Sequence, residues 1–352
     1  MKIIHIVYSL GLGGIETMLV NIANEQAKEH DVHIIVINDL CDEGLVAAIG
    51  KSVHFHCLMR KLKSRSVMPV VRLNMLLLKL HPDVIHAHIP SIVSLLLPVF
   101  RDRLCLTLHD VLPKNSKSVK YFGKPRKLFA ISASVRQSIR EQSRFDADIV
   151  PNGIRPELIS HSPHKRNDVF RIVQVSRLEH KKKGQHILIK AVRKIVDKGY
   201  KAFTVDLIGE GRSLSYLESL VAELGLHDYV HFLGARSQHY IFEHLHEYDL
   251  FVQPSIFEGF GLTVAEAMAA GVPVLVSANQ GPLEIIGNGA YGYSFKNRDV
   301  DDCAGKIEQF LTCGISPDKI KLAYKRVNEY YNVKNTASTY IAKYKEMAGT
   351  KS

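Results

Sequence analysis

The chain has 352 residues, of which 46% are hydrophobic, which is enough for two ordinary cores and too many for a disordered chain. No apolar run approaches the ~20 residues that a membrane-spanning helix needs, because residues 84–100, the longest candidate, contain two histidines and two prolines. The formal net charge is +11, and residues 1–165 carry 22 Lys and Arg against 14 Asp and Glu. Five widely spaced cysteines fit a reducing compartment, which favours a cytoplasmic protein.

Short β-rich runs alternate with helical patterns along the first half of the chain. Helices are expected over residues 16–28 and 67–80, and buried strands over residues 3–8, 32–37, 84–87, 104–108, 128–131 and 148–150. The same alternation restarts after residue 168. Helices are expected there over residues 186–198 and 213–224, and strands over residues 170–175, 204–208, 230–233, 250–253 and 272–276.

Two series of βαβ units predict an α/β protein with two parallel sheets, each doubly wound. A polar stretch with prolines, residues 153–168, is the expected linker, and residues 335–347 are typical of one C-terminal helix. Ligands of such sheets bind at the carboxyl ends of the strands. Two domains that face each other would therefore form a cleft with one side from each.

The most informative motif is a loop flanked by two acids, Glu258 and Glu266. Gly259, Phe260 and Gly261 follow the first acid, and the second acid is expected in the first turn of a helix. A glycine loop ahead of a helix offers backbone N–H groups and the helix dipole to an anion. The two carboxylates can accept hydrogen bonds from hydroxyls. An anion flanked by hydroxyl-rich groups describes a nucleotide sugar.

Residues 254–274 resemble the glutamate-spacer-glutamate motif of the retaining GT-B glycosyltransferases, the class called glycosyl transferases group 1 or family 4. Other stretches resemble the same family in the same order along the chain, namely residues 11–16, 86–88, 106–110, 150–154 and 175–184. The resemblance implies a GT-B fold of two Rossmann-like domains across a cleft. It implies an acceptor domain over residues 1–160, a nucleotide-sugar domain over 161–334, and a C-terminal helix over 335–352 that packs back on the first domain.

The resemblance also implies roles for the two acids and the loop between them. Glu266 would accept hydrogen bonds from the two ribose hydroxyls, although an acid that only satisfies the helix dipole is the alternative. Glu258 would contact the hydroxyls of the donor sugar and serve as a catalytic residue. The remaining donor-binding residues of this loop would be Phe260, Gly261, Leu262 and Thr263.

Two basic residues follow the first strand of the second half. Arg177 offers a forked donor set and Lys183 a compact charge, and both suit a departing nucleoside diphosphate. Lys183 adjoins Gly184 and matches the family spacing from the arginine, whereas Lys181 and Lys182 fit an ordinary solvated run.

Glycines after the first strand of the chain predict a second phosphate contact. Gly13 and Gly14 would let backbone N–H groups approach the distal phosphate of the donor, while a plain tight turn is the alternative. A nicotinamide fingerprint is a poorer match, because Glu16 stands where its third glycine should be. Glu16 more often caps such a helix than touches a substrate.

A histidine ends the fourth expected strand of the first half. His109 matches the family position that contacts the transferred sugar, although a merely satisfied polar residue is the alternative. His86 and His88 share one strand face, but with no third ligand nearby no metal site is expected. Two Asp-x-Asp triplets, at residues 146–148 and 299–301, are interpreted as surface acids.

The sequence therefore predicts a retaining hexosyltransferase that requires neither metal nor cofactor. It would move a sugar from a nucleotide diphosphate sugar, UDP being favoured over GDP, to a hydroxyl of a glycan or lipid-linked acceptor in cell-surface polysaccharide or lipopolysaccharide synthesis. The alternatives are a sugar-nucleotide epimerase of similar shape and a non-enzymatic basic protein that binds lipid or nucleic acid. Nucleic acid is the poorer partner, because no recognition motif interleaves aromatic residues with the basic ones.

Basic residues cluster at 60–65 and at 114–127 in the expected acceptor domain. They predict peripheral, electrostatic association with an anionic membrane, on the inner face of which a cytoplasmic enzyme would meet a lipid-linked acceptor. Neutralising four of them together should weaken that association, namely Lys117, Lys120, Lys124 and Lys127.

Overall fold

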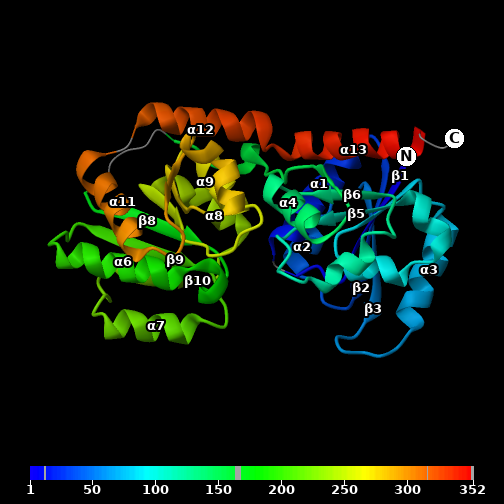
Figure 1. Ribbon diagram of the computed structural model, residues 1–352, viewed down its shortest axis with the longest axis horizontal. Helices are drawn as coiled ribbons and strands as arrows, with labels where there is room; N and C mark the ends of the chain where they lie inside the picture. Colours follow the sequence, from blue (N-terminus) through cyan, green and yellow to red (C-terminus); the bar gives the residue numbers. More distant parts are fainter. Residues whose placement is uncertain (12, 163–167, 315, 350–352) are drawn as a thin grey trace. The chain divides into compact units, whose positions relative to one another are not determined.

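The computed structural model of the protein describes residues 1–11, 13–162, 168–314 and 316–349 (Figure 1). The chain divides into two compact units, one of Met1–Ile154 with Tyr331–Ser352 and the other of Arg155–Tyr330. The first unit ends six residues before the predicted end of the first domain at residue 160. The chain returns to that unit at Tyr331, four residues before the predicted start of the C-terminal helix at residue 335.

The first unit contains a sheet of seven parallel strands within the described residues, in the order β3-β2-β1-β4-β5-β6-β7. The strands are β1 Lys2–Val7, β2 Asp31–Asn38, β3 Val53–Arg60, β4 Val84–Ala87, β5 Leu104–Leu108, β6 Lys127–Ala130 and β7 Asp148–Ile149. Helices α1 Gly14–Gln26, α2 Glu43–Ala47, α3 Met68–Leu80, α4 Ala133–Gln142 and α13 Val333–Gly349 belong to this unit, with 3₁₀ turns η1 Pro90–Leu95, η2 Pro98–Arg103 and η3 Lys117–Tyr121.

The second unit contains a sheet of six parallel strands within the described residues, in the order β10-β9-β8-β11-β12-β13. The strands are β8 Phe170–Val175, β9 Phe203–Ile208, β10 Val230–Gly234, β11 Leu250–Gln253, β12 Val274–Ser277 and β13 Tyr293–Phe295. Its helices are α5 His180–Lys183, α6 Gln185–Asp197, α7 Leu214–Glu223, α8 Gln238–His244, α9 Leu262–Ala269, α10 Gln280–Ile285, α11 Val300–Cys313 and α12 Pro317–Tyr330, with 3₁₀ turns η4 Pro156–Leu158, η5 Leu245–Glu247 and η6 Gly287–Gly289.

The prediction of two doubly wound parallel sheets is confirmed. Four strands have the predicted bounds and seven others lie within two residues of them, whereas β3 and β13 were not predicted. In each sheet the strand order reverses at one point, between β1 and β4 in the first and between β8 and β11 in the second. Such reversals open a crevice at the carboxyl ends of the strands, which is where ligands of doubly wound sheets bind.

Helix α13 belongs to the core of the first unit, where it packs along α1 (Figure 1). Its residues Tyr340 and Tyr344 are fully buried. The Tyr344 hydroxyl lies 2.5 Å from His86 Nδ1, and the Tyr340 hydroxyl lies 3.0 Å from Thr107 Oγ1. The prediction that the C-terminal helix packs on the first domain therefore agrees with these contacts.

The predicted linker, residues 153–168, is shorter in the structure, and residues 163–167 lie outside the described part. From Arg155 the chain belongs to the second unit, where the Ser160 amide donates to the Phe242 carbonyl at 2.9 Å. The Asp-x-Asp acids have structural partners: Asp146 binds Arg136 and Arg140, and Asp299 caps α11.

Candidate functional site

Glu258 and Lys183 meet after the two central strands of the second sheet. β8 and β11 are hydrogen-bonded neighbours, so the loops that follow them lie side by side. Lys183 Nζ donates to Glu258 Oε2 at 2.5 Å, and the two side chains are only 16% and 14% exposed. The Gln253 side-chain amide also reaches Glu258 Oε2, at 3.3 Å. A cation shielded from solvent and a carboxylate that accepts two hydrogen bonds thus lie side by side where the strand order of the sheet reverses.

Backbone contacts hold these two loops in fixed register. The amides of Ile256 and Phe257 both donate to the Lys182 carbonyl, at 2.9 and 3.2 Å. Gly184 has φ +71°, and a Cβ atom placed on it would lie 1.9 Å from the Pro254 carbonyl oxygen. Only glycine accommodates both the left-handed conformation and this close approach. The position of Lys183 opposite Glu258 therefore depends on the residue that follows it.

The glycine loop leads into helix α9, as the motif predicts. Gly261 is the N-cap with φ +105°, and α9 begins at Leu262. The amides of Leu262 and Thr263 are among the first of the helix and have no carbonyl of that helix to bind. Together with the helix dipole they form a site for negative charge beside Lys183 and Glu258.

Glu266 was predicted in the first turn of its helix, and that prediction is wrong. Because α9 begins at Leu262, Glu266 is its fifth residue, beyond the turn in which an acid relieves the helix dipole. The side chain is buried, at 9% exposure, and burial raises the pKa of its carboxyl from 4.5 to about 7. Within the described residues, the structure gives this carboxylate no hydrogen-bond partner. A buried acid without a partner is costly, so its charged form is disfavoured in the folded protein.

Replacing Glu266 by glutamine is expected to stabilise the protein at pH 8. The folded-state pKa lies above the ordinary value, so the protonated acid is favoured on folding. Its contribution is fully present below about pH 4.5 and is lost as the pH rises through 7, at a cost of up to about 3 kcal/mol. The difference in unfolding midpoint between Glu266→Gln and the parent protein should therefore grow from pH 5 to pH 8. A constant difference would contradict the burial argument.

Arg177 lies on the loop after β8, with an exposed side chain. A buried side chain fixes its backbone: the Gln185 side-chain amide donates to the Arg177 carbonyl at 2.9 Å, and Gln185 is fully buried. A Cβ atom on Gly209, at the end of β9, would lie 2.0 Å from the Ser176 carbonyl oxygen. Gln185, Gly209 and Gln253 were not predicted as part of the site. The sequence signal that could have identified the two glutamines is a single amide side chain within or next to an otherwise apolar strand or helix.

The first unit places Gly13, Gly14 and His109 at the carboxyl edge of its own sheet. Gly13 is the N-cap of α1 and Gly14 its first residue, and α1 is the helix that follows β1. Glu16 folds back over this turn, because a Cβ atom on Gly13 would lie 2.4 Å from Glu16 Oε2. That position agrees with a capping role for Glu16 rather than a substrate contact.

His109 is the end of a buried chain of imidazoles. Its Nε2 lies 3.1 Å from His88 Nδ1, His88 Nε2 lies 3.0 Å from His5 Nδ1, and His5 Nε2 lies 2.8 Å from Gln26 Oε1. Burial lowers the pKa of His5 to about 4 and that of His109 to about 3, and it lowers the pKa of His88 well below 6.5. The three rings are therefore neutral at physiological pH, and each carries one proton.

The orientation of the Gln26 side-chain amide, whose oxygen faces His5, sets which nitrogen of each ring carries the proton. A carbonyl oxygen only accepts, so His5 donates to Gln26 through Nε2 and accepts from His88 through Nδ1. His88 in turn accepts from His109 Nε2–H. His109 Nδ1 then holds a lone pair, and this atom is buried without a hydrogen-bond partner within the described residues. The arrangement prepares His109 to accept a hydrogen bond from a ligand hydroxyl.

We expect long-range ¹H–¹⁵N NMR spectra of histidine-labelled protein to show His5, His88 and His109 as neutral Nε2–H tautomers at pH 7. The variants His5→Gln, His88→Gln and His109→Gln assign the resonances. Gln26→Leu removes the fixed acceptor, so His5 should become a tautomer mixture. A His109 ring protonated at Nδ1 would mean that the chain runs in the opposite direction.

The reason given for expecting no metal at His86 and His88 is wrong. His5 lies opposite His86 in the pairing of β1 and β4, and His5, His86 and His88 offer ligand atoms within 4.8 Å of one another. Both nitrogens of His86 already have partners, Tyr344 and Thr107. A second such group, Asp31, His33 and His54, lies on β2 and β3, where the rings of His33 and His54 are stacked.

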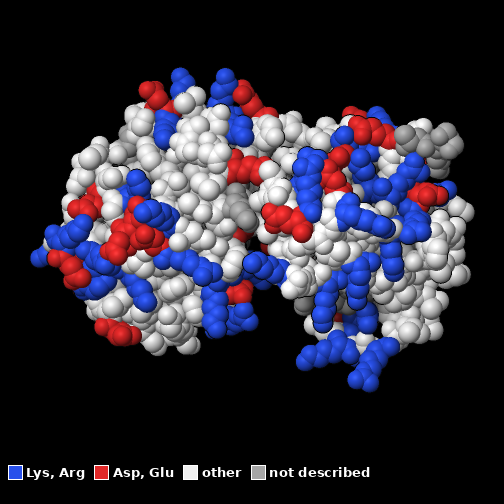
Figure 2. Space-filling view, viewed as in Figure 1, with Lys and Arg blue, Asp and Glu red and all other residues white. Residues whose placement is uncertain are grey.

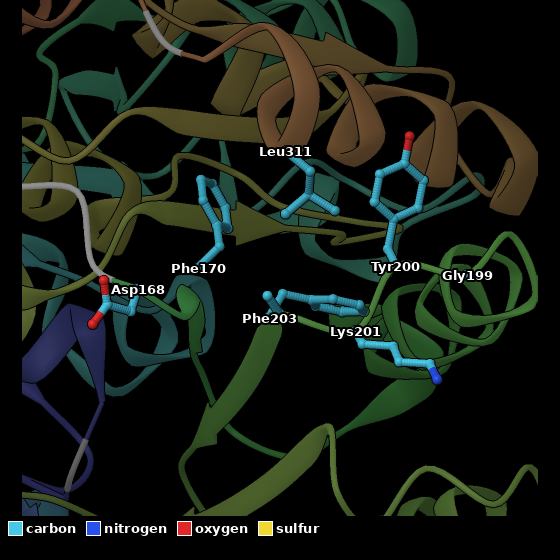
Figure 3. Close-up of a pocket in the computed structure, with 8 residues that line it drawn as sticks. Asp168, Phe170, Gly199, Tyr200, Lys201, Phe203 and Leu311 are labelled. Carbon is cyan, nitrogen blue, oxygen red and sulfur yellow. The ribbon is translucent and has the colours of Figure 1, made fainter.

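One pocket of the second unit lies away from these residues. It is lined by Phe170, Phe203 and Leu311 among others (Figure 3). Phe170 and Phe203 are the first residues of β8 and β9, so this pocket opens at the amino ends of the strands. Arg177, Lys183 and Glu258 lie at the carboxyl ends, which leaves the pocket outside the candidate site.

Two family models together match residues 12–327 of the chain. Glycosyltransferase Family 4 matches residues 12–158, and glycosyl transferases group 1 matches residues 157–327. The sucrose synthase of Denitrovibrio acetiphilus is 37% identical over 133 residues, which are 35% of this chain and 17% of that protein. WcaL of Salmonella typhimurium, a glycosyltransferase named for colanic acid biosynthesis, is 30% identical over 164 residues, which are 45% of this chain and 39% of that protein. The chain thus spans well under half the length of these two relatives.

The fold also matches solved structures. Anabaena Alr3699/HepE in complex with UDP-glucose superposes with a TM-score of 0.80 at 20% sequence identity, covering 98% of this chain and 100% of that chain. The predicted two-sheet fold thus agrees with that of a solved protein over nearly its whole length. None of the described helices is both long enough and apolar enough to span a bilayer.

Proposed function

Because this chain belongs to the glycosyl transferases group 1 family and has the GT-B fold, we propose that it transfers a hexose from a nucleoside diphosphate sugar to a hydroxyl acceptor, with retention of configuration and without a metal. The observation that carries the proposal is the Lys183–Glu258 pair beside the N-terminus of α9, with the buried, unpartnered carboxylate of Glu266 one turn further on.

The donor is held by charges and hydroxyl acceptors of the second unit. Arg177, Lys183 and the first amides of α9 stabilise the diphosphate, including the charge that develops as it leaves. Glu266 accepts from the ribose hydroxyls, and Glu258 accepts from hydroxyls of the transferred sugar. By the family resemblance, Gly13 and Gly14 would contact the distal phosphate, and His109 Nδ1 would accept from a sugar hydroxyl. Phe260 lies buried in the loop that shapes this site.

The reaction breaks the bond between the anomeric carbon and the distal phosphate oxygen and forms a bond from that carbon to the acceptor oxygen. In front-face displacement, the leaving phosphate oxygen takes the acceptor's proton as the new bond forms on the same face. Lys183 then balances the charge left on the diphosphate. Glu258 Oε2 accepts hydrogen bonds from Lys183 and Gln253, and this scheme does not require Glu258 as the base.

UDP is the nucleotide we favour over GDP. The support is the UDP-glucose bound to the Anabaena neighbour, at 20% identity. The nucleobase would lie near residues 234–236, where the Ala235 amide is held by Glu210 Oε1 at 3.4 Å. A glycan or lipid-linked acceptor is favoured by the name of WcaL and by the basic first unit. An enzyme of this kind would work in the cytoplasm, at the inner face of the membrane.

Release of free nucleoside diphosphate from UDP-, GDP- and ADP-sugars, with and without acceptor, tests the proposal. NMR of the product then reads the anomeric configuration. An inverted product, or strict dependence on Mg²⁺ or Mn²⁺, would contradict the mechanism. Conversion of the donor alone would instead indicate an epimerase. Ligand binding unchanged by Glu258→Ala, without any turnover, would indicate a non-enzymatic binding protein.

The role of Glu266 predicts how nucleotide affinity changes with pH. Only the carboxylate accepts from both ribose hydroxyls. Because burial raises the pKa of Glu266 to about 7, UDP should bind more tightly as the pH rises through that value. Charged hydrogen bonds contribute roughly 1.5–3 kcal/mol each, so Glu266→Gln should weaken UDP binding by about tenfold or more at pH 8. Calorimetry at pH 6 and pH 8 measures both effects. A parent protein and a Glu266→Gln variant with the same pH dependence would rule out the ribose contact.

A further inference from the structure

Helix α3 carries apolar side chains on two opposite faces. One face contains Leu73 and Leu77, which are fully buried in the first unit. Met68, Val71, Met75 and Leu78 form a second stripe, spaced three, four and three residues apart, and are 42% to 62% exposed. A helix needs one apolar face to pack on its own domain. The second apolar stripe is therefore not needed to pack α3 on the first unit.

Positive charge borders this stripe. Residues 51–82 contain seven Lys and Arg and no Asp or Glu. Figure 2 shows Lys and Arg side chains gathered at the tip of the loop between β3 and α3, and a surface of uncharged residues along α3. Lys61, Lys63 and Arg65 of that loop are exposed, as are the large apolar side chains of Leu62 and Val67 beside them. Apolar and cationic groups therefore form one continuous surface, which we call the α3 surface.

The other basic stretch of the first unit differs in kind. Residues 114–127 contain six Lys and Arg, but Lys127 is paired with Asp148 at 2.9 Å. Within the described residues, no large exposed hydrophobic side chain lies between Val99 and Leu158. This stretch can attract an anionic surface at long range, but it offers nothing to insert.

An occupant of the α3 surface must accept apolar side chains and phosphate-seeking cations at the same time. An anionic bilayer does both, since methionine, valine and leucine enter the boundary of head groups and acyl chains while lysine and arginine stay at the phosphates. A nucleic acid would take the cations and leave the apolar stripe in water. A neutral partner protein would cover the stripe and leave the cations without counter-charge.

We propose that the α3 surface docks on an anionic bilayer, with Met68, Val71, Met75 and Leu78 entering the head-group boundary and Lys61, Lys63 and Arg65 lying on the phosphates. The docking itself needs no substrate. Only its purpose, which is to bring the enzyme to a lipid-linked acceptor, rests on the proposed function. The docking extends the electrostatic association predicted from sequence, because it adds an apolar term that salt does not screen.

The test is sedimentation with vesicles of phosphatidylglycerol and phosphatidylcholine, compared with pure phosphatidylcholine, at 0.1 and 1 M salt. The apolar variant is Val71→Gln/Met75→Gln/Leu78→Gln, and the basic variant is Lys61→Gln/Lys63→Gln/Arg65→Gln. Lys114→Gln/Lys117→Gln/Lys120→Gln removes the same charge elsewhere in the unit. Lys201→Gln/Lys306→Gln/Lys321→Gln removes it from the second unit and serves as the control.

The parent protein should bind anionic vesicles preferentially. Each basic residue near an anionic surface is worth about fivefold in affinity, so the basic variant should bind more than tenfold more weakly at 0.1 M salt. The variant in residues 114–120 should lose clearly less, because that stretch has no large exposed apolar side chain to insert, and the second-unit control should match the parent. The apolar variant should lose more than tenfold as well, and should be removed completely by 1 M salt, where the screening length is about 3 Å.

Unfolding midpoints of every variant show whether a loss of vesicle binding comes from loss of folding. UDP calorimetry on every variant shows whether the donor site is intact. All variants should bind UDP as the parent does. An apolar variant that binds vesicles like the parent would overturn the proposal. So would a parent protein that forms a dimer lost only in the apolar variant, because a second copy would then be the occupant. If UDP does not bind the parent protein but the vesicle results stand, the proposed function fails and the docking surface remains.

Discussion

Replacing Glu258 by glutamine is expected to lower donor turnover by about 10²–10³-fold while free UDP binds at least as tightly as it binds the parent protein. In the parent, Glu258 neutralises Lys183 at 2.5 Å in a shielded position. The glutamine leaves the full charge of Lys183 to the diphosphate, so affinity for the nucleotide should rise or stay constant. Turnover should fall because the amide no longer offers a charged acceptor to the transferred sugar. Calorimetry with UDP and release of UDP from the donor measure the two effects.

Two matched variants distinguish this interpretation from general damage to the loop. Lys183→Gln should lose both nucleotide affinity and turnover, since it removes the cation that the diphosphate needs. Glu258→Asp keeps the charge and should recover part of the turnover. An equal loss of UDP affinity in Glu258→Gln and Glu266→Gln would show that the two acids do not divide the donor between sugar and ribose.

Gly184→Ala is expected to be one of the most damaging single-methyl changes in the second unit. The added Cβ would lie 1.9 Å from the backbone oxygen of Pro254, and a backbone carbonyl cannot rotate away as a side chain can. The left-handed backbone alone costs roughly 1–2 kcal/mol, and relieving the overlap must separate the loops after β8 and β11. We expect a loss of more than about 4 kcal/mol together with loss of UDP binding. Thermal unfolding and calorimetry measure them.

Gly199 provides the control for conformation without the overlap. Its φ is +92°, and a Cβ atom placed on it meets nothing within 4 Å. Gly199→Ala should therefore cost only the backbone term, roughly 1–2 kcal/mol, and leave UDP binding intact. If the two alanine variants unfold at the same temperature, the contact between Gly184 and Pro254 has no energetic importance.

The parts of the site that could be predicted are those encoded in consecutive residues. The strand before Pro254, the Gly259–Gly261 turn and the helix after it follow one another in the chain, so local turn and helix signals locate them. The meeting of Lys183 with Glu258 joins residues 75 positions apart. It could be anticipated only because both follow central strands of a doubly wound sheet, whose carboxyl ends converge.

The depth of Glu266 could not be predicted because it depends on where one helix starts. An acid at the head of an alanine-rich run indicates a helix N-terminus, but Gly261 starts α9 four residues earlier by adopting a left-handed cap. That shift of one turn moves the carboxylate from the exposed end of the helix to a buried position. Burial at that position raises the pKa of the carboxyl, and the pH dependence that we expect for nucleotide binding rests on it.

Cross-strand partners were missed for a different reason. His5 lies inside an apolar strand and attracts no notice in the sequence, yet the register of β1 with β4 places it opposite His86. Register between parallel strands depends on the packing of both faces, which a single sequence does not display. The second apolar stripe of α3 was missed similarly, because the pattern shows that a residue is apolar but not whether another element covers it.

The return of the chain at Tyr331 has a consequence for the order in which the protein can fold. Tyr340 and Tyr344 supply hydrogen-bond partners for Thr107 and His86 in the first sheet, but these tyrosines leave the ribosome only after the entire second unit. During synthesis, the second unit can close around its core while the first still lacks its last helix. Until α13 packs on the first sheet, His86 Nδ1 lacks the tyrosine hydroxyl that it contacts in the folded protein.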